Sequence, residues 1–153
     1  MRSLLKKVIC MAALAAAAFS FVSAQAQEVA PKTSGNPIFP GWYADPEAII
    51  YGDRYWIYPT YSAPYDQQVF FDCFSSADLV TWTKHEKLIT NEEVKWARRA
   101  MWAPSVIRHE GKYYFFFAAN DVHEGEVGGI GVAVSDKPEG PYRDLLGKPL
   151  IGR

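Results

Sequence analysis

The chain of 153 residues carries 16 basic and 17 acidic side chains, which gives a formal net charge of −1. This length accommodates one ordinary domain. A near-neutral charge without a basic stripe offers no electrostatic footprint for nucleic acid or for an anionic membrane surface. We therefore expect neither of these among the partners of the mature protein.

Residues 1–26 have the pattern of a secretory signal peptide. The basic residues Arg2, Lys6 and Lys7 precede an alanine-rich apolar run over residues 8–22, and small residues that suit signal peptidase follow. The apolar run is shorter than the roughly 20 residues of a membrane-spanning helix. The sequence therefore predicts a secreted or periplasmic protein, and loss of the three basic residues leaves its mature chain with a formal charge of −4.

The mature chain keeps one cysteine, Cys73, within an apolar run. A single thiol can form no internal disulfide, so the fold must be stabilised by packing. We expect Cys73 to be a small buried hydrophobic residue.

Residues 27–35 form a polar leader, and residues 36–46 open the folded part of the chain with three prolines, a glycine and one carboxylate. Asp45 precedes a proline, a position that disfavours helical backbone, so we expect Asp45 in an extended segment that enters the first strand. Trp42 and Tyr43 offer flat apolar faces with polar edges, which suits the binding of a sugar. A plain Asp-Pro turn explains the same residues equally well.

The sequence repeats itself with a period of 58 residues. Residues 46–58 align with residues 104–116, and in each copy an apolar strand is followed by a glycine turn and a strongly aromatic strand. The turn centres are Gly52-Asp53 and Glu110-Gly111, where glycine supplies the positive φ of a tight hairpin. The aromatic strands are apolar on both faces, which is typical of strands packed between two neighbours.

Each copy continues into two further short strands. The expected strands are residues 69–75 and 81–84 in the first copy and residues 129–135 and 141–143 in the second. Four short strands at a fixed period are typical of a propeller blade. The sequence therefore predicts an all-β fold, a β-propeller of four-stranded blades, with blade 1 at about residues 45–90 and blade 2 at about residues 101–150.

Four motifs follow one another along the chain: Asn-Pro…Gly…Ala-Asp-Pro in residues 36–46, Tyr-Gly-Asp-x-Tyr-Trp in residues 51–56, Ser-Ser-Ala-Asp-Leu-Val-Thr-Trp in residues 75–82 and Met-Trp-Ala-Pro-Ser-Val in residues 101–106. Together these motifs resemble glycoside hydrolase family 43. It implies a five-bladed β-propeller, of which residues 36–153 form about two blades. It also implies hydrolysis, with inversion, of glycans that contain arabinose, xylose or galactose.

By this resemblance Asp45 matches the general base of the family. An inverting glycosidase needs that base to deprotonate a water, opposite a carboxylic acid about 6.5–9.5 Å away. Trp102 matches a family tryptophan beside the pocket, although packing between blades explains it equally well, and Trp42 is a candidate sugar contact. The resemblance puts the acid and a second, pKa-tuning aspartate in later blades, beyond Arg153. Residues 27–153 alone are therefore expected to fold poorly and to lack activity.

Five carboxylates inside the chain are alternative partners for Asp45: Glu47, Asp72, Asp121, Glu124 and Glu126. Glu47 would lie on the same side of an extended segment as Asp45, so it is poorly placed to oppose it. The loop after the second aromatic strand can reach the pocket, and Asn120, Asp121 and His123 are candidate substrate contacts. A solvated polar loop is the alternative. The spacing of its ionisable residues matches no standard metal-ligand pattern, and we expect neither a metal nor a cofactor.

Two functions are compatible with these residues. The first is a glycoside hydrolase whose partner is a polysaccharide or oligosaccharide substrate, and the second is a non-catalytic carbohydrate-binding propeller. An aspartate opening a third blade and a glutamate in a fourth would decide for the enzyme. The sequence leaves the sugar, the linkage, the exo or endo mode of action and the oligomeric state open.

Overall fold

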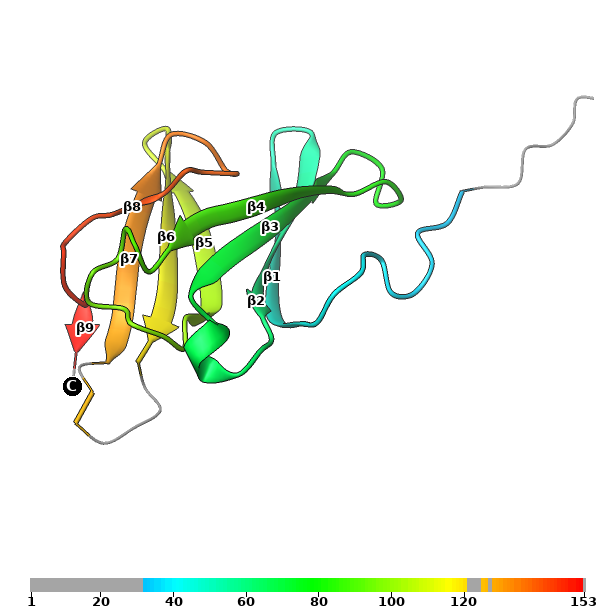
Figure 1. Ribbon diagram of the computed structural model, residues 1–153. Helices are drawn as coiled ribbons and strands as arrows, with labels where there is room; N and C mark the ends of the chain where they lie inside the picture. The colour runs from blue at the N-terminus through cyan, green and yellow to red at the C-terminus, as the bar shows by residue number, and fades with distance from the viewer. Residues whose placement is uncertain (1–31, 121–124, 127, 153) are drawn as a thin grey trace, which may run out of the picture. The chain divides into compact units, whose positions relative to one another are not determined.

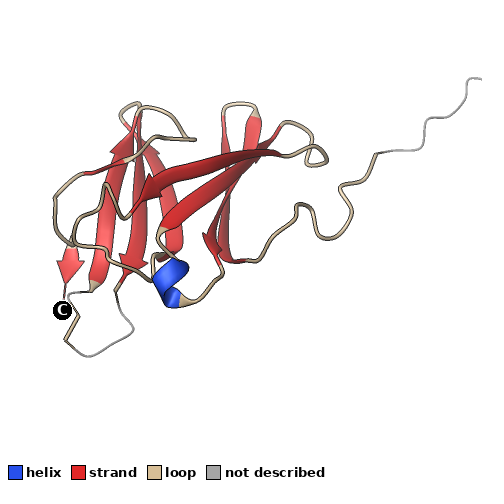
Figure 2. Cartoon of the chain, in the orientation of Figure 1, coloured by secondary structure: helices blue, strands red, loops and turns tan. Residues whose placement is uncertain are grey.

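The computed structural model describes residues 32–120, 125–126 and 128–152. Within these ranges nearly all regular structure is strand, with one short 3₁₀ helix (Figure 2). The elements in chain order are β1 (Tyr43–Tyr51), β2 (Arg54–Tyr61), η1 (Tyr65–Gln67), β3 (Phe70–Ser76), β4 (Thr83–Thr90), β5 (Trp102–His109), β6 (Lys112–Ala119), β7 (Gly129–Ser135), β8 (Arg143–Asp144) and β9 (Ile151–Gly152). The predicted signal peptide lies outside the described residues. In the part of the chain that is described, no helix has the length and apolar character needed to cross a membrane.

The strands form two antiparallel sheets (Figure 1). The first has the order β1-β2-β3-β4, and the second has the order β5-β6-β7-β8, with β9 also pairing with β7. The predicted all-β architecture of about two blades is confirmed. The fourth strand of the second sheet differs from the prediction, because the backbone N–H of Tyr142 donates to the carbonyl of Leu88 in the first sheet, at 2.8 Å. Only the two residues of β8 then pair with β7, and β9 extends the sheet.

The predicted internal repeat is present in the strand register itself. Ala44 pairs with Thr60 in the first sheet, and Trp102 pairs with Ala118 in the second. Trp102 follows Ala44, and Ala118 follows Thr60, by the same 58-residue period. Each copy has a register irregularity just after this pair, before Glu47 and before Ser105. The two predicted hairpin turns are also confirmed, with positive φ at Gly52 and Gly111 (63° and 79°).

An aromatic core joins the two sheets. Tyr58 and Phe71 of the first sheet and Phe115 and Phe117 of the second are fully buried and pack edge to face, with ring centroids 4.9–6.2 Å apart. Phe115 and Phe117 alternate along β6 with half-buried residues, as expected for a strand with one face in the core. The predicted burial of Cys73 is confirmed, since this residue belongs to the same core.

Two side chains of β1 bind the backbone of β5 at Val106. The carboxylate of Glu47 accepts the Val106 N–H at 2.9 Å, and the hydroxyl of Tyr51 donates to the Val106 carbonyl at 2.9 Å. The Tyr51 ring also contacts Tyr113 edge to face, with centroids 4.9 Å apart. Blade 2 is therefore tied to blade 1 by side chains as well as by the core.

This contact makes stability sensitive to high pH. Burial, with smaller contributions from Glu47 and Tyr113, raises the pKa of Tyr51 to about 12. In an unfolded chain the phenol ionises near pH 10. Between these values the folded state holds one proton more than the unfolded state, so the stability due to Tyr51 is complete below about pH 10 and falls toward about pH 12.

We expect Tyr51→Phe to lower the free energy of unfolding by about 1 kcal/mol at neutral pH, because it removes one buried hydrogen bond. The difference from the unaltered protein should shrink as the pH rises from about 10 to about 12, because only the unaltered protein carries the titrating phenol. Thermal unfolding across this range measures both effects in the protein expressed from the complete reading frame.

Tyr114→Phe is the matched control. The Tyr114 hydroxyl has no hydrogen-bond partner among the described residues, and Tyr114 lies on the face of β6 opposite Tyr113, the residue that contacts Tyr51. Its unfolding should differ little from that of the unaltered protein at neutral pH. A Tyr51→Phe difference that stays constant up to about pH 12 would contradict the assignment.

Candidate active site

Asp45 lies at the register irregularity of β1, between Ala44 and Glu47, and its φ is 47°. The expected extended segment is confirmed, because Asp45 lies within β1, but the φ of Asp45 itself is left-handed rather than extended. A bulge re-aims the side chain that it carries, and aspartate is one of the few residues that tolerate left-handed backbone. The bulge turns the Asp45 side chain to an exposed position at the start of the first hairpin.

Thr60 links this carboxylate to blade 2. Its hydroxyl lies 3.3 Å from Oδ2 of Asp45 and accepts the backbone N–H of Ala103 at 2.8 Å. Ala103 is the repeat counterpart of Asp45 and has almost the same φ, 49°. Sequence analysis missed Thr60; the available signal was a hydroxyl at the end of an aromatic strand whose repeat counterpart is Ala118.

Tyr43 fixes the start of β1 beside Asp45. Its hydroxyl donates to Oδ2 of Asp72 at 3.1 Å, and the Asp72 carboxylate also binds Lys84 Nζ at 3.0 Å and the Lys87 N–H at 2.9 Å. Burial, and next the charge of Asp72, raises the pKa of Tyr43. The phenol therefore stays neutral as a donor, and Asp72, only 2% exposed, is fully occupied with holding the strand.

Gly41 and Trp42 precede this anchor. Gly41 has a φ of 118°, and a Cβ at this position would lie 2.6 Å from Cε2 of Tyr43, so the packing of the Tyr43 ring requires glycine. The Trp42 carbonyl accepts the Ser62 N–H at 2.9 Å, whereas the Trp42 side chain is 82% exposed. An indole held by its backbone and open to solvent can stack on a sugar, and the predicted role of Trp42 stays a prediction.

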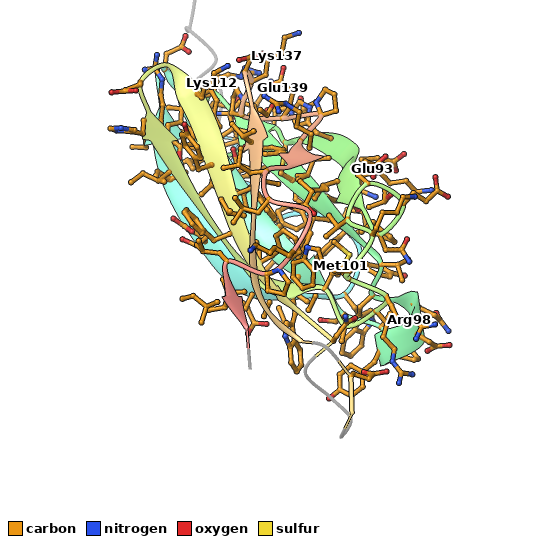
Figure 3. All side chains as sticks on the ribbon, turned by 90° about the vertical axis from the view of Figure 1, so that its left-hand side faces the viewer. Glu93, Arg98, Met101, Lys112, Lys137 and Glu139 are labelled. Atoms are coloured by element: carbon orange, nitrogen blue, oxygen red, sulfur yellow. The ribbon has the colours of Figure 1, made fainter. Side chains whose placement is uncertain are left out.

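Trp102 begins β5 and is half-buried beside Ala103. Its ring contacts Tyr65 of η1 edge to face, with centroids 5.6 Å apart. The segment before Trp102 is tied to the same region, because the Ala100 N–H donates to the Tyr65 carbonyl at 2.9 Å. Met101 lies in the interior, with Arg98 nearer the lower edge (Figure 3). Tyr65 was not singled out from the sequence, because loop residues show no periodicity.

Asn120 is buried, with 2% of its surface exposed, and holds the segment that leads to β5. Its side-chain oxygen accepts the backbone N–H groups of Arg98 and Arg99 at 2.7 and 3.1 Å, and its amide nitrogen donates to the Trp96 carbonyl. The predicted contact between Asn120 and a substrate stays a prediction, and the bonds point to a structural role. The other two loop candidates, Asp121 and His123, lie outside the described residues.

The described carboxylates that sequence analysis considered as partners for Asp45 are engaged elsewhere. Glu47 binds Val106, Asp72 binds Lys84, and Glu126 forms an ion pair with Arg99. Asp121 and Glu124 lie outside the described residues. Over the ranges that the structure describes, no group of three or more His, Cys, Asp and Glu side chains is arranged to hold a metal ion.

We expect Asn120→Ala to lower the free energy of unfolding by about 2 kcal/mol, because it removes a buried side chain that binds the backbone N–H groups of Arg98 and Arg99. Asn120→Asp keeps the accepting oxygen and should recover part of this loss. Thermal unfolding of both variants measures the effect. Unchanged stability in Asn120→Ala would contradict the structural role and favour the predicted contact with a substrate.

Comparison with known proteins places this geometry in a family. Residues 34–152 match the family model described as "Glycosyl hydrolases family 43". Beta-D-galactofuranosidase xynD of Aspergillus niger is 52% identical over 130 residues, which are 77% of this chain and 37% of that protein. Xylosidase/arabinosidase 43A of Humicola insolens is 35% identical over 113 residues, which are 65% of this chain and 34% of that protein.

The fold agrees with solved structures of the same family. The crystal structure of a GH43_1 enzyme from Xanthomonas citri complexed with xylotriose superposes with a TM-score of 0.62 and 30% identity, covering 71% of this chain and 33% of that one. A thermostable family-43 glycoside hydrolase gives a TM-score of 0.63 at 26% identity, covering 80% of this chain and 38% of that one. This chain spans about a third of the length of these relatives. Because the family model matches most of the length of this chain, the chain belongs to glycosyl hydrolases family 43.

Proposed function

We propose that this chain carries the general base of an inverting glycoside hydrolase, and that Asp45 is that base. The observation that carries the proposal is the setting of the Asp45 carboxylate. It is exposed on a left-handed bulge at the inner strand of blade 1, and Thr60 binds one of its two oxygens. Among the described residues the other oxygen, Oδ1, has no hydrogen-bond partner, so it is available to take a proton from water.

The site has the surroundings that a sugar requires. Two tryptophans lie next to the paired bulges in sequence: Trp42 is three residues before Asp45, and Trp102 directly precedes Ala103, whose N–H binds Thr60. Sugars bind through apolar ring faces combined with directed hydrogen bonds, and indole rings provide the apolar part. The acid that protonates the leaving group must come from another carboxylate, since Glu47, Asp72 and Glu126 are bound to other partners.

The substrate class is a glycan that contains arabinose, xylose or galactose. The relatives at 52% and 35% identity are described as a beta-D-galactofuranosidase and a xylosidase/arabinosidase. The structural neighbour from Xanthomonas citri was solved with xylotriose. Since the first relative is the more similar of the two, aryl galactofuranosides are the first substrates to assay, followed by aryl arabinofuranosides and xylosides.

We expect Asp45→Asn to lower kcat by about 10² to 10⁴, because an amide cannot take the proton of the attacking water. The binding of an unhydrolysed oligosaccharide should survive, since the amide keeps the shape of the side chain. Steady-state kinetics and calorimetric titration on the protein from the complete reading frame measure the two effects. Near-normal turnover in this variant would exclude Asp45 as the base.

The same experiment tests the alternative of a non-catalytic carbohydrate-binding propeller. A protein of that kind binds the oligosaccharide but hydrolyses no aryl glycoside in either the unaltered or the Asp45→Asn form. Turnover in the unaltered protein alone supports the enzyme.

We also propose that the protein is exported. The support is the basic start, apolar run and small residues of the first 26 residues. We expect the protein recovered from the medium or periplasm to begin at Gln27, or at Gln25 if the earlier site is cleaved. N-terminal sequencing measures this, and an intact Met1 on the mature protein would contradict it.

A further inference from the structure

We propose that Thr60 is a positioning residue for the general base, and that it sets the base relative to blade 2. This rests on the proposed role of Asp45. The observation is a pair of hydrogen bonds through one hydroxyl: Thr60 Oγ1 to Asp45 Oδ2 at 3.3 Å, and Ala103 N–H to Thr60 Oγ1 at 2.8 Å.

The direction of both bonds follows from the chemistry of the groups. A backbone N–H can only donate, so Thr60 must accept from Ala103. The one proton of the hydroxyl is then free for another acceptor, and an ionised carboxylate is an acceptor only. Thr60 therefore donates to Oδ2 of Asp45.

The threonine is itself held firmly. Its side chain is 2% exposed, and its backbone pairs with Ala44 at the end of β2. A β-branched side chain has few accessible rotamers, so its hydroxyl cannot swing away from the bulge at low cost. The distance to Oδ2, 3.3 Å, is longer than the 2.5–3.0 Å typical of O–H···O bonds.

The bond fixes one carboxylate oxygen and leaves the other for water. Oδ2 is bound to Thr60, whereas Oδ1 has no hydrogen-bond partner among the described residues, and the residue as a whole is exposed. Because the acceptor side of the same hydroxyl binds Ala103, the base is held at a set position relative to Trp102, the residue before Ala103. The Thr60 hydroxyl oxygen thus positions both Asp45 on blade 1 and the start of β5, which carries Trp102, on blade 2.

The test is Thr60→Val in the protein from the complete reading frame. Valine keeps the shape of threonine but removes the hydroxyl. A misplacement of about 1 Å can lower the rate about 10²-fold, so we expect kcat to fall by about tenfold to a hundredfold. KM should change by less than about twofold, since Thr60 does not touch the substrate. Thr60→Ser restores the hydroxyl and should recover kcat to within about threefold of the unaltered protein.

Tyr51→Phe is the matched control for stability. It also removes a hydroxyl that binds the backbone of β5, but at Val106 rather than Ala103. It should lower stability by a similar amount and leave kcat unchanged. If Thr60→Val is unfolded at the assay temperature, Thr60→Cys replaces it, because its thiol is a weaker donor at the same position and should give an intermediate loss of kcat.

The outcomes separate this inference from the proposed function. Loss of turnover in Asp45→Asn together with full kcat in Thr60→Val, or in Thr60→Cys where that variant is used, overturns the role of Thr60 alone. Equal losses of kcat in Thr60→Val and Tyr51→Phe, or failure of Thr60→Ser to recover kcat, would show a general effect of stability and also overturn it. Near-normal turnover in Asp45→Asn overturns the proposed function itself.

Discussion

The ring of Phe115 is where the two sheets meet. It is fully buried and contacts Tyr58, Phe71 and Tyr142, with centroids 6.2, 4.9 and 5.2 Å away. Edge-to-face packing of this kind favours particular angles between rings, so it orients the sheets as well as holding them together. Because these rings join the two sheets, β1 and β5 lie side by side, and the bulges at Asp45 and Ala103 both contact Thr60.

The two copies of the repeat use the same backbone distortion for different purposes. Asp45 and Ala103 occupy equivalent bulges, each in left-handed backbone that costs a non-glycine residue about 1–2 kcal/mol. In blade 1 the bulge presents a carboxylate, and in blade 2 it presents a backbone N–H to Thr60. The pairing of the surrounding strands holds this backbone conformation in both copies. Of the two bulges, only the one in blade 1 carries a side chain that can act as a base.

The strands and the repeat could be predicted from the sequence because they depend on local patterns. The hairpin turns, the aromatic strands and the 58-residue register follow from glycine placement and from the alignment of residues 46–58 with residues 104–116. The backbone of Asp45 could not be predicted, because the rule for residues before proline describes an average and the bulge depends on pairing with β2. The roles of Thr60 and Asn120 were also out of reach, because their partners are backbone groups that lie far away in sequence.

The way in which Glu47 and Tyr51 bind Val106 bears on how a repeat array avoids misassembly. The backbone groups of Val106 that face away from β6 would otherwise belong to an open sheet edge, which can recruit a strand from another chain. Side chains from β1 occupy both of these groups instead. The two blades thus touch at their inner strands, β1 and β5, while remaining two separate sheets. The Glu47 carboxylate and the Tyr51 hydroxyl thus occupy the hydrogen-bonding groups that a strand from another chain would need at this point of the edge.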